Sequence, residues 1–404
     1  MNQKGIHFGL LAGTVIATAL VACGGGGGGD LAPAPPASTL GTLAVSMTDA
    51  PACGFDEVNV TVAKVRIHKS GSAGDSDAGW TDITLDPARK INLLNLTNGV
   101  LEPLGQARLE AGRYQQLRLV LDPNTYGTAN TVVPSGGKAE QALETPSALQ
   151  NGIKLVGGFD VMAGQKADVV LDFDACKSIV ERGKGNYALK PVVKIVPGAV
   201  NGISGFVSTA LLGSRVTVSA QQNGSIVSST TPNVATGGFL LSRLAPGNYD
   251  VVITADDSAA SVVASVPVAS STSTTALSTS AAPLMLAPGM TGSIAGSVTL
   301  APPSPDEVAW VAARQSFAGG PTVTIRYQGA DLDSGAYTLA NLPVAAPQYA
   351  LYNAALPLVF SASSATAPGK YLVEASAAGY ASKAVDAVDI TTRNRSNVDF
   401  RLTP

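Results

Sequence analysis

The sequence predicts an all-β protein in which three β-sandwich-like domains follow an apolar leader and a flexible tether. Three observations support this fold class. Short segments alternate apolar with polar residues, which is typical of strands with one buried face. Gly and Pro clusters separate these segments, as in domains built of short strands and turns. Two stretches in the second half of the chain repeat the same motifs, which indicates two copies of one unit.

The N-terminus has a lone Lys4, a largely apolar run over residues 6–21 and the sequence Leu-Val-Ala-Cys ending at Cys23. The run is shorter than the about 20 residues that a membrane-spanning helix needs. An ordinary secretory leader would explain the run but not the cysteine at its end. The segment resembles the signal peptide and lipobox of bacterial lipoproteins. This resemblance implies removal of residues 1–22 and attachment of a diacylglycerol and a further acyl chain, such as palmitate, to Cys23.

Residues 23–40 show no apolar periodicity and form the predicted tether, with six glycines followed by an Ala/Pro-rich stretch. A flexible chain of this length spans about 20 to 25 Å, so we expect the folded part to stand off the lipid headgroups. Gly24 follows the cysteine where some lipoproteins have an aspartate. The lipoprotein resemblance therefore implies sorting to the outer membrane.

The first β domain is expected over residues 41–197, where period-two alternation recurs. The phase of the alternation changes by one residue near Ala63, which is what a β-bulge would produce. The alternating apolar positions are Leu43, Val45, Met47, Val58, Val60, Val62, Val65, Ile67, Leu117, Leu119, Leu121, Val169, Leu171 and Phe173.

Two cysteines remain if Cys23 takes the lipid, namely Cys53 and Cys176. An even pair in an oxidising compartment predicts a disulfide, and two buried thiols are the alternative. The chain-entropy model gives such a bond at most about 5 kcal/mol of stabilisation, because the loop that it closes is long.

Six ordered motifs lie within the first domain: residues 46–51 (SMTDAP), 58–67 (VNVTVAKVRI), 91–99 (INLLNLTNG), 111–119 (AGRYQQLRL), 171–175 (LDFDA) and 187–191 (YALKP). Together they resemble the DUF4382 domain of bacterial lipoproteins. The resemblance implies a β-rich envelope domain and names no reaction. Since Cys176 directly follows the LDFDA motif, its bond to Cys53 would link that strand to the segment after Pro51.

The second half of the chain contains an internal repeat. The Ala-Pro-Gly-x-Tyr sequence at residues 245–249 recurs at 367–371, an offset of 122. The same offset relates Val263 to Val385, Val266 to Val388 and Val268 to Ile390. Upstream the offset is 98, where Gly237, Phe239, Leu241 and Leu244 match Gly335, Tyr337, Leu339 and Leu342. The second copy is therefore expected to contain an insertion of about 24 residues, over residues 344–366.

Each copy reads as strand, turn, Gly-x-aromatic-x-Leu strand, Pro-Gly-x-Tyr turn and strand. This order resembles the carboxypeptidase-regulatory-like (transthyretin-like) seven-stranded sandwich. The expected domains cover residues 201–282 and 291–404. The resemblance implies binding or spacing rather than catalysis.

The sequence contains little that resembles a catalytic motif. His68 is the one histidine outside the leader, and its place after an alternating strand favours a solvated strand end over a general base. Ser135 and Lys138 have Ser-x-x-Lys spacing but lie in a Gly loop rather than at the start of a helix. There is no Gly-x-Ser-x-Gly motif, and the cysteines and histidine lack zinc-ligand spacing. The sequence predicts neither an enzyme nor a cofactor.

Five carboxylates are the candidates for calcium ligands, although solvated acidic residues are the simpler interpretation and we expect no metal. They are Asp75, Asp77 and Asp82 around Trp80, and Asp172 and Asp174 on one strand. Aromatic residues offer a possible ligand surface, at Trp80 and at Tyr349, Tyr352 and Phe360 of the insertion. The alternative is a core tryptophan and an extra hairpin that covers a sheet edge.

These observations predict a lipid-anchored, non-catalytic protein of the cell envelope, at the outer membrane, that acts as a surface binding or structural module. A carbohydrate-binding lipoprotein is the alternative, followed by a hydrolase accessory domain. The expected partners are the membrane, through the lipid, and an envelope protein or glycan. The net charge of −3 gives no electrostatic reason to bind nucleic acid.

Overall fold

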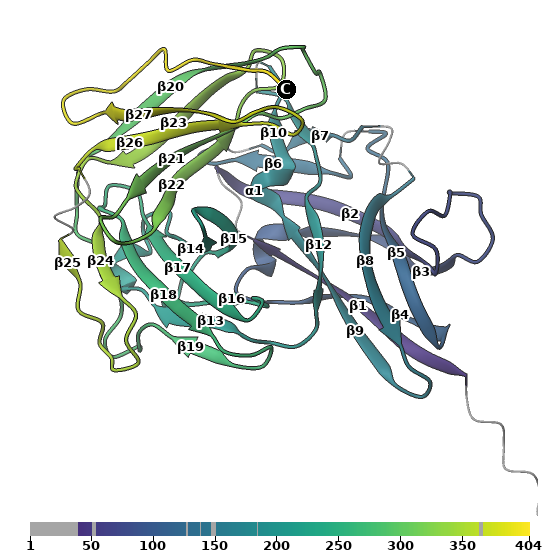
Figure 1. The fold of residues 1–404 in the computed structure, drawn as a ribbon. Coiled ribbons are helices and arrows are strands. Elements are labelled where there is room, and N and C mark those ends of the chain that lie inside the picture. Colours follow the sequence, from purple (N-terminus) through teal and green to yellow (C-terminus); the bar gives the residue numbers. More distant parts are fainter. Residues whose placement is uncertain are drawn as a thin grey trace, which may run out of the picture. The chain divides into compact units, whose positions relative to one another are not determined.

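The computed structural model describes residues 39–50, 54–126, 128–137, 139–146, 151–183, 185–362 and 367–404. The leader, Cys23, Cys53 and Lys138 lie outside these ranges. The described part is built almost wholly of β-strands (Figure 1), with one short helix, α1 (Ala175–Ser178), and 3₁₀ turns at Leu93–Leu96 and Thr209–Leu211. The all-β prediction is confirmed. No helix in these ranges is long and apolar enough to cross a membrane.

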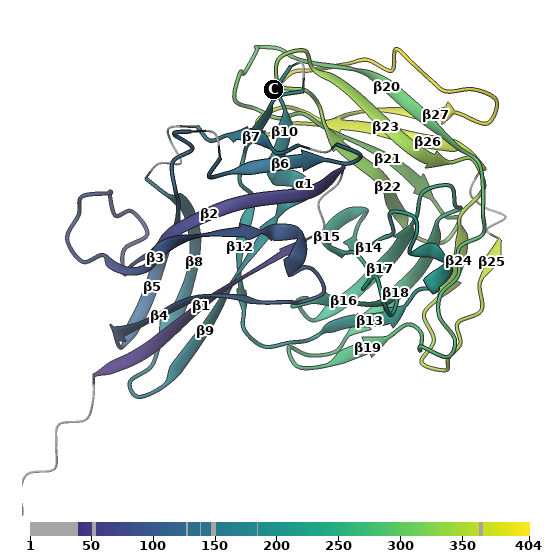
Figure 2. The same cartoon turned by 180° about the vertical axis from the view of Figure 1, so that it is seen from behind.

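The N-terminal sandwich consists of two sheets (Figure 2). One has the order β12-β9-β1-β4, with β1 (Leu40–Ala50) parallel to β9 (Lys166–Asp174) and antiparallel to β4 (Glu102–Glu110), and with β12 (Val193–Pro197) at its edge. The other has the order β10-β11-β7-β6-β2-β5-β8, and β3 also pairs with β2. Its strands are β2 (Phe55–His68), β3 (Thr81–Asn92), β5 (Gly112–Leu121), β6 (Thr131–Pro134), β7 (Gln141–Glu144), β8 (Ile153–Val161), β10 (Ile179–Glu181) and β11 (Tyr187–Leu189).

The predicted bulge near Ala63 is confirmed. The pairing of β2 with both β3 and β5 shifts register between Val62 and Lys64. Before the bulge Val60 and Val62 are fully buried, and after it Val65 and Ile67 are. The extra residue therefore keeps one face of a 14-residue strand on the core despite the change of phase.

The middle sandwich has seven strands of its own in two sheets, with orders β16-β13-β19 and β15-β14-β17-β18. The strands are β13 (Gly202–Phe206), β14 (Thr217–Gln222), β15 (Ser225–Thr230), β16 (Gly238–Ser242), β17 (Gly247–Thr254), β18 (Ser261–Val268) and β19 (Thr274–Ala276). Its core contains Tyr249, which is 1% exposed and whose hydroxyl donates to the Ala245 carbonyl at 2.7 Å.

The C-terminal sandwich has the same strand order in its two sheets, β23-β20-β28 and β22-β21-β26-β27. The strands are β20 (Thr291–Leu300), β21 (Trp310–Ser316), β22 (Thr322–Gly329), β23 (Ala336–Pro343), β26 (Lys370–Ser376), β27 (Lys383–Asp389) and β28 (Phe400–Leu402). In both sandwiches the first strand pairs in parallel with the last. The two stretches that the sequence repeat relates thus share one topology.

Two further strands, β24 (Gln348–Leu351) and β25 (Ser361–Ala362), lie within the insertion. They pair with the middle sandwich rather than with their own, because β24 runs parallel to β18 with Ser261 opposite Gln348. The insertion thus covers the edge of a neighbouring sheet (Figure 1). Val252, Ala260 and Val262 of the middle sandwich also belong to the apolar core of the C-terminal one.

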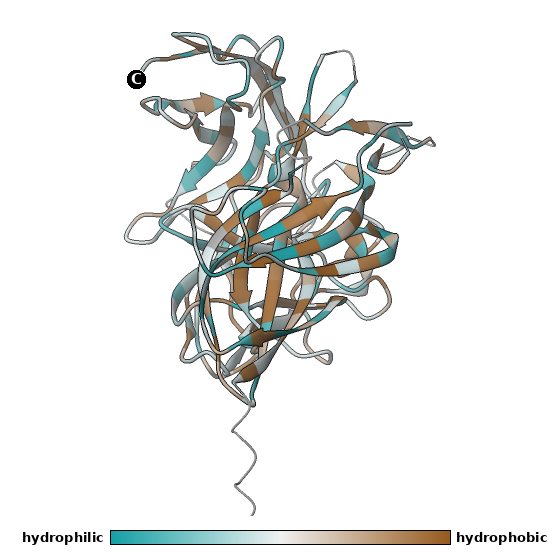
Figure 3. Ribbon diagram, turned by 90° about the vertical axis from the view of Figure 1, so that its right-hand side faces the viewer, coloured by the Kyte–Doolittle hydropathy of each residue, from teal (hydrophilic) through white to brown (hydrophobic). Residues whose placement is uncertain are grey.

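In Figure 3 the ribbon is coloured by the hydropathy of each residue, and bands of hydrophobic and hydrophilic colour alternate along many strands, as the period-two pattern predicts.

Candidate functional site

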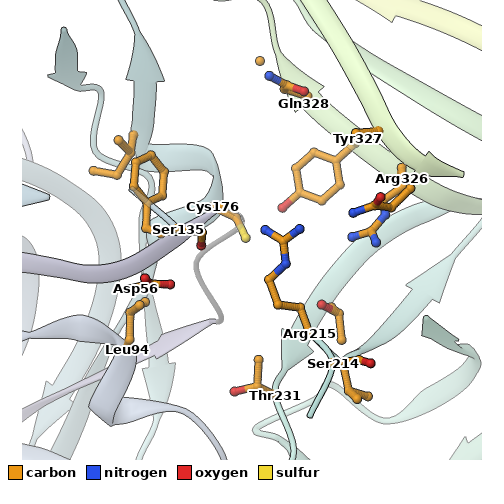
Figure 4. Close-up of a pocket in the computed structure, with 18 of the residues that line it drawn as sticks. Asp56, Leu94, Ser135, Cys176, Ser214, Arg215, Thr231, Arg326, Tyr327 and Gln328 are labelled. Atoms are coloured by element: carbon orange, nitrogen blue, oxygen red, sulfur yellow. The ribbon is translucent and has the colours of Figure 1, made fainter. Parts of the chain in front are cut away.

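A pocket of about 530 Å³ is lined by residues of all three sandwiches (Figure 4). This volume lies within the range of small-molecule sites, about 300 to 1,000 Å³. The lining residues come from loops, from the ends of strands and from the strands β10, β22 and β23. Their chemistry differs from one wall to the other.

The wall from the N-terminal sandwich is apolar and aromatic, with carboxylates at exposed positions. Phe55 and Tyr187 line it and pack edge to face, with ring centroids 5.3 Å apart. Asp56 and Glu181 are exposed side chains on the same wall. Ser135 also lines it, and its hydroxyl oxygen is buried without a hydrogen-bond partner in the described part of the chain.

The wall from the middle and C-terminal sandwiches is cationic. Arg215 lies just before β14, and its Nε is 2.9 Å from Oδ2 of Asp256. Arg326, on β22, places Nη2 3.2 Å from Oδ1 of the same carboxylate. Asn341 donates to that oxygen at 3.0 Å. One carboxylate thus holds two guanidinium groups, so this wall has an excess of positive charge.

The two arginines differ in exposure. The Arg215 side chain is 57% exposed, whereas that of Arg326 is 25% exposed. Burial lowers the pKa of the Arg326 guanidinium, and Asp256 partly opposes this shift. Its Nε is buried without a partner among the described residues. Figure 4 shows the Arg215 guanidinium and the Tyr327 hydroxyl pointing toward the wall with Cys176 and Ser135.

Tyr327 adds a phenol hydroxyl to the lining of this pocket. Burial raises its pKa well above the ordinary value, and the nearby carboxylates of Asp174 and Asp49 add to the shift. The phenol is therefore neutral at physiological pH and can donate a hydrogen bond. With two arginines, a phenol and several hydroxyl and amide side chains, the pocket is equipped to bind a polar ligand.

His68 and Trp80 are not among the residues that line this pocket; His68 ends β2, and Trp80 lies in the following loop, directly before β3. The Trp80 ring is half-buried between two guanidinium groups, with Arg66 4.6 Å and Arg118 4.9 Å from its centroid. Its Nε1 donates to the Gly74 carbonyl at 2.8 Å. His68 accepts from Ser70 N through Nδ1 at 2.9 Å and has Nε2 3.0 Å from the Ala78 carbonyl. Both rings thus make contacts with backbone groups that stabilise the loop.

The three carboxylates around Trp80 that are candidate calcium ligands each have a protein partner. Asp75 pairs with Arg118, Asp82 with Lys64 and Arg66, and Asp77 accepts from Gly74 N at 2.9 Å. On β9, Asp174 caps α1 and pairs with Lys177 at 2.8 Å. In the described ranges, no three His, Cys, Asp or Glu side chains come together as a metal ion would require.

The fifth carboxylate, Asp172, lies beside Arg243 in a small pocket between the N-terminal and middle sandwiches. Burial, reinforced by Asp174, raises the pKa of Asp172 to about 6. Burial lowers the pKa of Arg243, whose Nε and Nη2 have no partner in the described structure. This environment could not be predicted from the sequence, because the strand pattern does not show what packs against the strand.

The aromatic residues of the insertion are half-buried rather than fully exposed to solvent. Tyr349 packs on Phe317 of the C-terminal sandwich, with centroids 4.9 Å apart. Tyr352 and Phe360 pack against the core of the middle sandwich. Together with the β18 pairing, these contacts correspond to the alternative of a hairpin that covers a sheet edge.

Sequence reasoning missed the residues that form the cationic wall. Arg215, Asp256 and Arg326 belong to no motif, and they are far apart in the chain. A charged residue on an alternating strand, such as Arg326 on β22, is ordinarily read as solvent-facing. Cys176 is 7% exposed and lines the pocket, whereas Cys53 and Cys23 lie outside the described residues.

Several solved structures are similar to parts of this chain. A type II cohesin–X-dockerin complex from Acetivibrio cellulolyticus is 27% identical over 23% of this chain and 59% of its own, with a TM-score of 0.19. The Bacillus anthracis TIE protein is 10% identical over 90% of this chain and 50% of its own, with a TM-score of 0.16. The Corynebacterium diphtheriae major pilin SpaA is 12% identical over 90% and 100%, with a TM-score of 0.20.

No curated protein matches the chain. The motifs of the N-terminal sandwich do have a counterpart among protein families. Residues 40–191 match the model of the family described as "Domain of unknown function (DUF4382)", as the motifs in this part of the chain predict.

Proposed function

We propose that this chain is a lipid-anchored, non-catalytic protein of the cell envelope that acts as a binding or structural module. The pocket at the meeting of the three sandwiches supports the binding role, because it combines a cationic wall with an aromatic one. His68 does not line this pocket; it ends β2, where backbone groups contact both of its ring nitrogens. The lipobox-like sequence at Cys23 supports the anchor, and the DUF4382 resemblance supports the envelope location.

Replacing Cys23 with Ser should release the protein from the membrane. The substitution removes the sulfur to which the diacylglycerol would be joined, and each buried methylene contributes about 0.8 kcal/mol to anchoring. We expect nearly all wild-type protein in the membrane fraction and most of the C23S variant in the soluble fraction of lysed cells. A variant that stays in the membrane fraction after a high-salt wash would contradict the lipid anchor.

The side of the outer membrane on which the sandwiches lie decides which partners they can meet. Protease treatment of intact cells, with an epitope at the C-terminus and a periplasmic protein as leakage control, separates the two sides. Cleavage on intact cells favours adhesion or glycan capture. Protection until the outer membrane is opened favours a periplasmic scaffold.

We also propose that Cys53 and Cys176 form a disulfide. The parallel strands β1 and β9 end beside each other, with Ala50 opposite Asp174. Asp49 accepts from Ala175 N at 3.0 Å across the same ends. Gly54, the neighbour of Cys53, lines the same pocket as Cys176. These positions bring the flanking residues of the two cysteines to one place.

Thiol titration of the mature protein in denaturant, without reductant, checks this bond. We expect no reactive thiol before reduction and two after it, with an accompanying loss of up to about 5 kcal/mol of stability. Two reactive thiols in the untreated protein would show that the cysteines are unpaired.

A carbohydrate-binding role is the second candidate. The observation that favours it is the combination of aromatic rings and hydroxyl or amide side chains around one pocket, since aromatic faces can stack on sugar rings. Saturable glycan binding would separate this role from that of a structural spacer.

A further inference from the structure

The cationic wall of the pocket has hydrogen-bond donors without a partner among the described residues. Asp256 takes only Nε of Arg215, and the two terminal nitrogens of that guanidinium have no protein partner among the described residues. These nitrogens form a fork that matches the two oxygens of a carboxylate. Because the side chain is already held at Nε, less of its conformational freedom would be lost on binding.

The charges around the pocket are separated rather than mixed. Arg215 and Arg326 lie on one wall, and the pocket-lining carboxylates Asp56 and Glu181 lie on the other. The Asp56 carboxylate accepts from Gly136 N at 3.2 Å. An anionic group is attracted to the first wall and repelled from the second, so a ligand with a single carboxylate would bind in one orientation.

The remaining lining fits a hydroxylated ring. Phe55 and Tyr187 present aromatic surface on the wall opposite the arginines. Short polar side chains surround the space between the walls, namely Thr97, Ser214, Thr217, Thr231, Gln328 and Asn341. Such groups can donate to and accept from sugar hydroxyls, while the rings can pack on the C–H face of the sugar.

We propose that this pocket binds an acidic sugar, whose carboxylate pairs with the guanidinium of Arg215 and whose ring lies toward Phe55 and Tyr187. This inference rests on the proposed binding function and specifies its ligand class. A volume of about 530 Å³ accommodates one or two sugar rings. Arg326 acts as a positioning residue, because it shares Asp256 with Arg215 and so helps to fix the Arg215 side chain.

Titration calorimetry of the full mature chain tests the proposal with methyl α-galacturonoside, which carries one carboxylate, and with its methyl ester. The ester keeps the ring and hydroxyls but lacks the negative charge. We expect saturable binding of the acid and at least tenfold weaker binding of the ester. Arg215→Gln should weaken binding of the acid at least tenfold, and Arg215→Lys at least threefold because an ammonium group cannot pair as a fork.

Arg113→Gln is the matched control. Arg113 is also an exposed arginine, 60% exposed and 3.1 Å from Asp160, but it does not line the pocket. Its variant should bind the acid as the wild type does, and the melting temperature of every variant should stay close to that of the wild type. If Arg215→Gln does not fold, Arg215→Lys decides the matter.

Equal binding of acid and ester would overturn the acidic-sugar proposal and leave a neutral carbohydrate site. Binding that Arg215→Gln and Arg215→Lys leave unchanged would overturn the assignment to this pocket. No binding of either sugar would overturn the inference, while the results of fractionation and protease treatment would stand independently. Failure of the proposal thus differs from failure of the envelope function.

Discussion

Replacing Gly237 with Ala should destabilise the middle sandwich by about 3 kcal/mol, and Gly335→Ala should do the same to the C-terminal sandwich. Both glycines have left-handed backbone conformations, with φ of +71° and +70°. A Cβ on Gly237 would lie 2.2 Å from the Val207 carbonyl oxygen, and one on Gly335 would lie 2.2 Å from that of Val298. The backbone must move in each variant, which weakens the strand contact beside it.

The two glycines close the same turn in both sandwiches. Gly237 N donates to the Asn233 carbonyl at 2.8 Å, and Gly335 N donates to the Asp331 carbonyl at 2.7 Å. The side-chain oxygens of Asn233 and Asp331 accept from backbone N–H groups within the turn. The Gly237 carbonyl accepts from Val207 N, directly after β13, at 2.9 Å, and the Gly335 carbonyl accepts from Val298 N of β20 at 2.8 Å. A change in the backbone conformation of either glycine would weaken the hydrogen bond that its carbonyl accepts.

Urea unfolding and hydrogen exchange of the wild type and both variants measure the effect. Each variant should lose exchange protection mainly in its own sandwich. Gly213→Ala is the control, because a Cβ there meets nothing within 4 Å, and it should change stability by less than about 0.5 kcal/mol. A Gly237→Ala variant as stable as the control would show that the turn relaxes without cost.

The sequence predicted the parts of the fold that local patterns encode. A one-residue change of phase located the bulge at Ala63, since side chains alternate between the two faces of a strand. The match of Gly237 to Gly335 corresponds to one turn built twice. The offset changes from 98 to 122 after Leu342, and strands β24 and β25 lie in that interval.

The candidate site could not be predicted from the same patterns. Arg215 and Asp256, in loops next to β14 and β17, meet Arg326 of β22 because two sandwiches pack together, and no periodicity encodes that packing. The pairing of β24 with β18 is likewise a contact between sandwiches. The aromatic residues of the insertion are candidates for a ligand surface on sequence grounds. Their sequence pattern fits exposure on a loop as well as it fits packing against a neighbouring sandwich.

Asp172 shows the same limit of sequence patterns and has a consequence for pH dependence. It lies on β9, with Lys194 of β12 and Thr48 of β1 as its strand partners. Burial is the main cause that raises its pKa from 3.8 to about 6, and Asp174 reinforces it. Lys194, Arg243 and Lys177 oppose the shift without cancelling it. The folded state therefore binds this proton more tightly than the unfolded state does.

Asp172→Asn should raise the free energy of unfolding at pH 7.5 by about 2 to 3 kcal/mol, from 1.36 kcal/mol per pKa unit. Because the folded pKa is raised, protonation of Asp172 stabilises the fold below its unfolded pKa of 3.8, and this contribution is lost as the pH rises through about 6. The variant should lack that loss between pH 4 and 7. Asp168→Asn, at an exposed carboxylate that pairs with Lys166 at 2.7 Å on the same strand, should follow the wild-type profile. Urea midpoints across this pH range decide the matter, and parallel profiles for the wild type and Asp172→Asn would mean that the carboxylate is hydrated in the folded state.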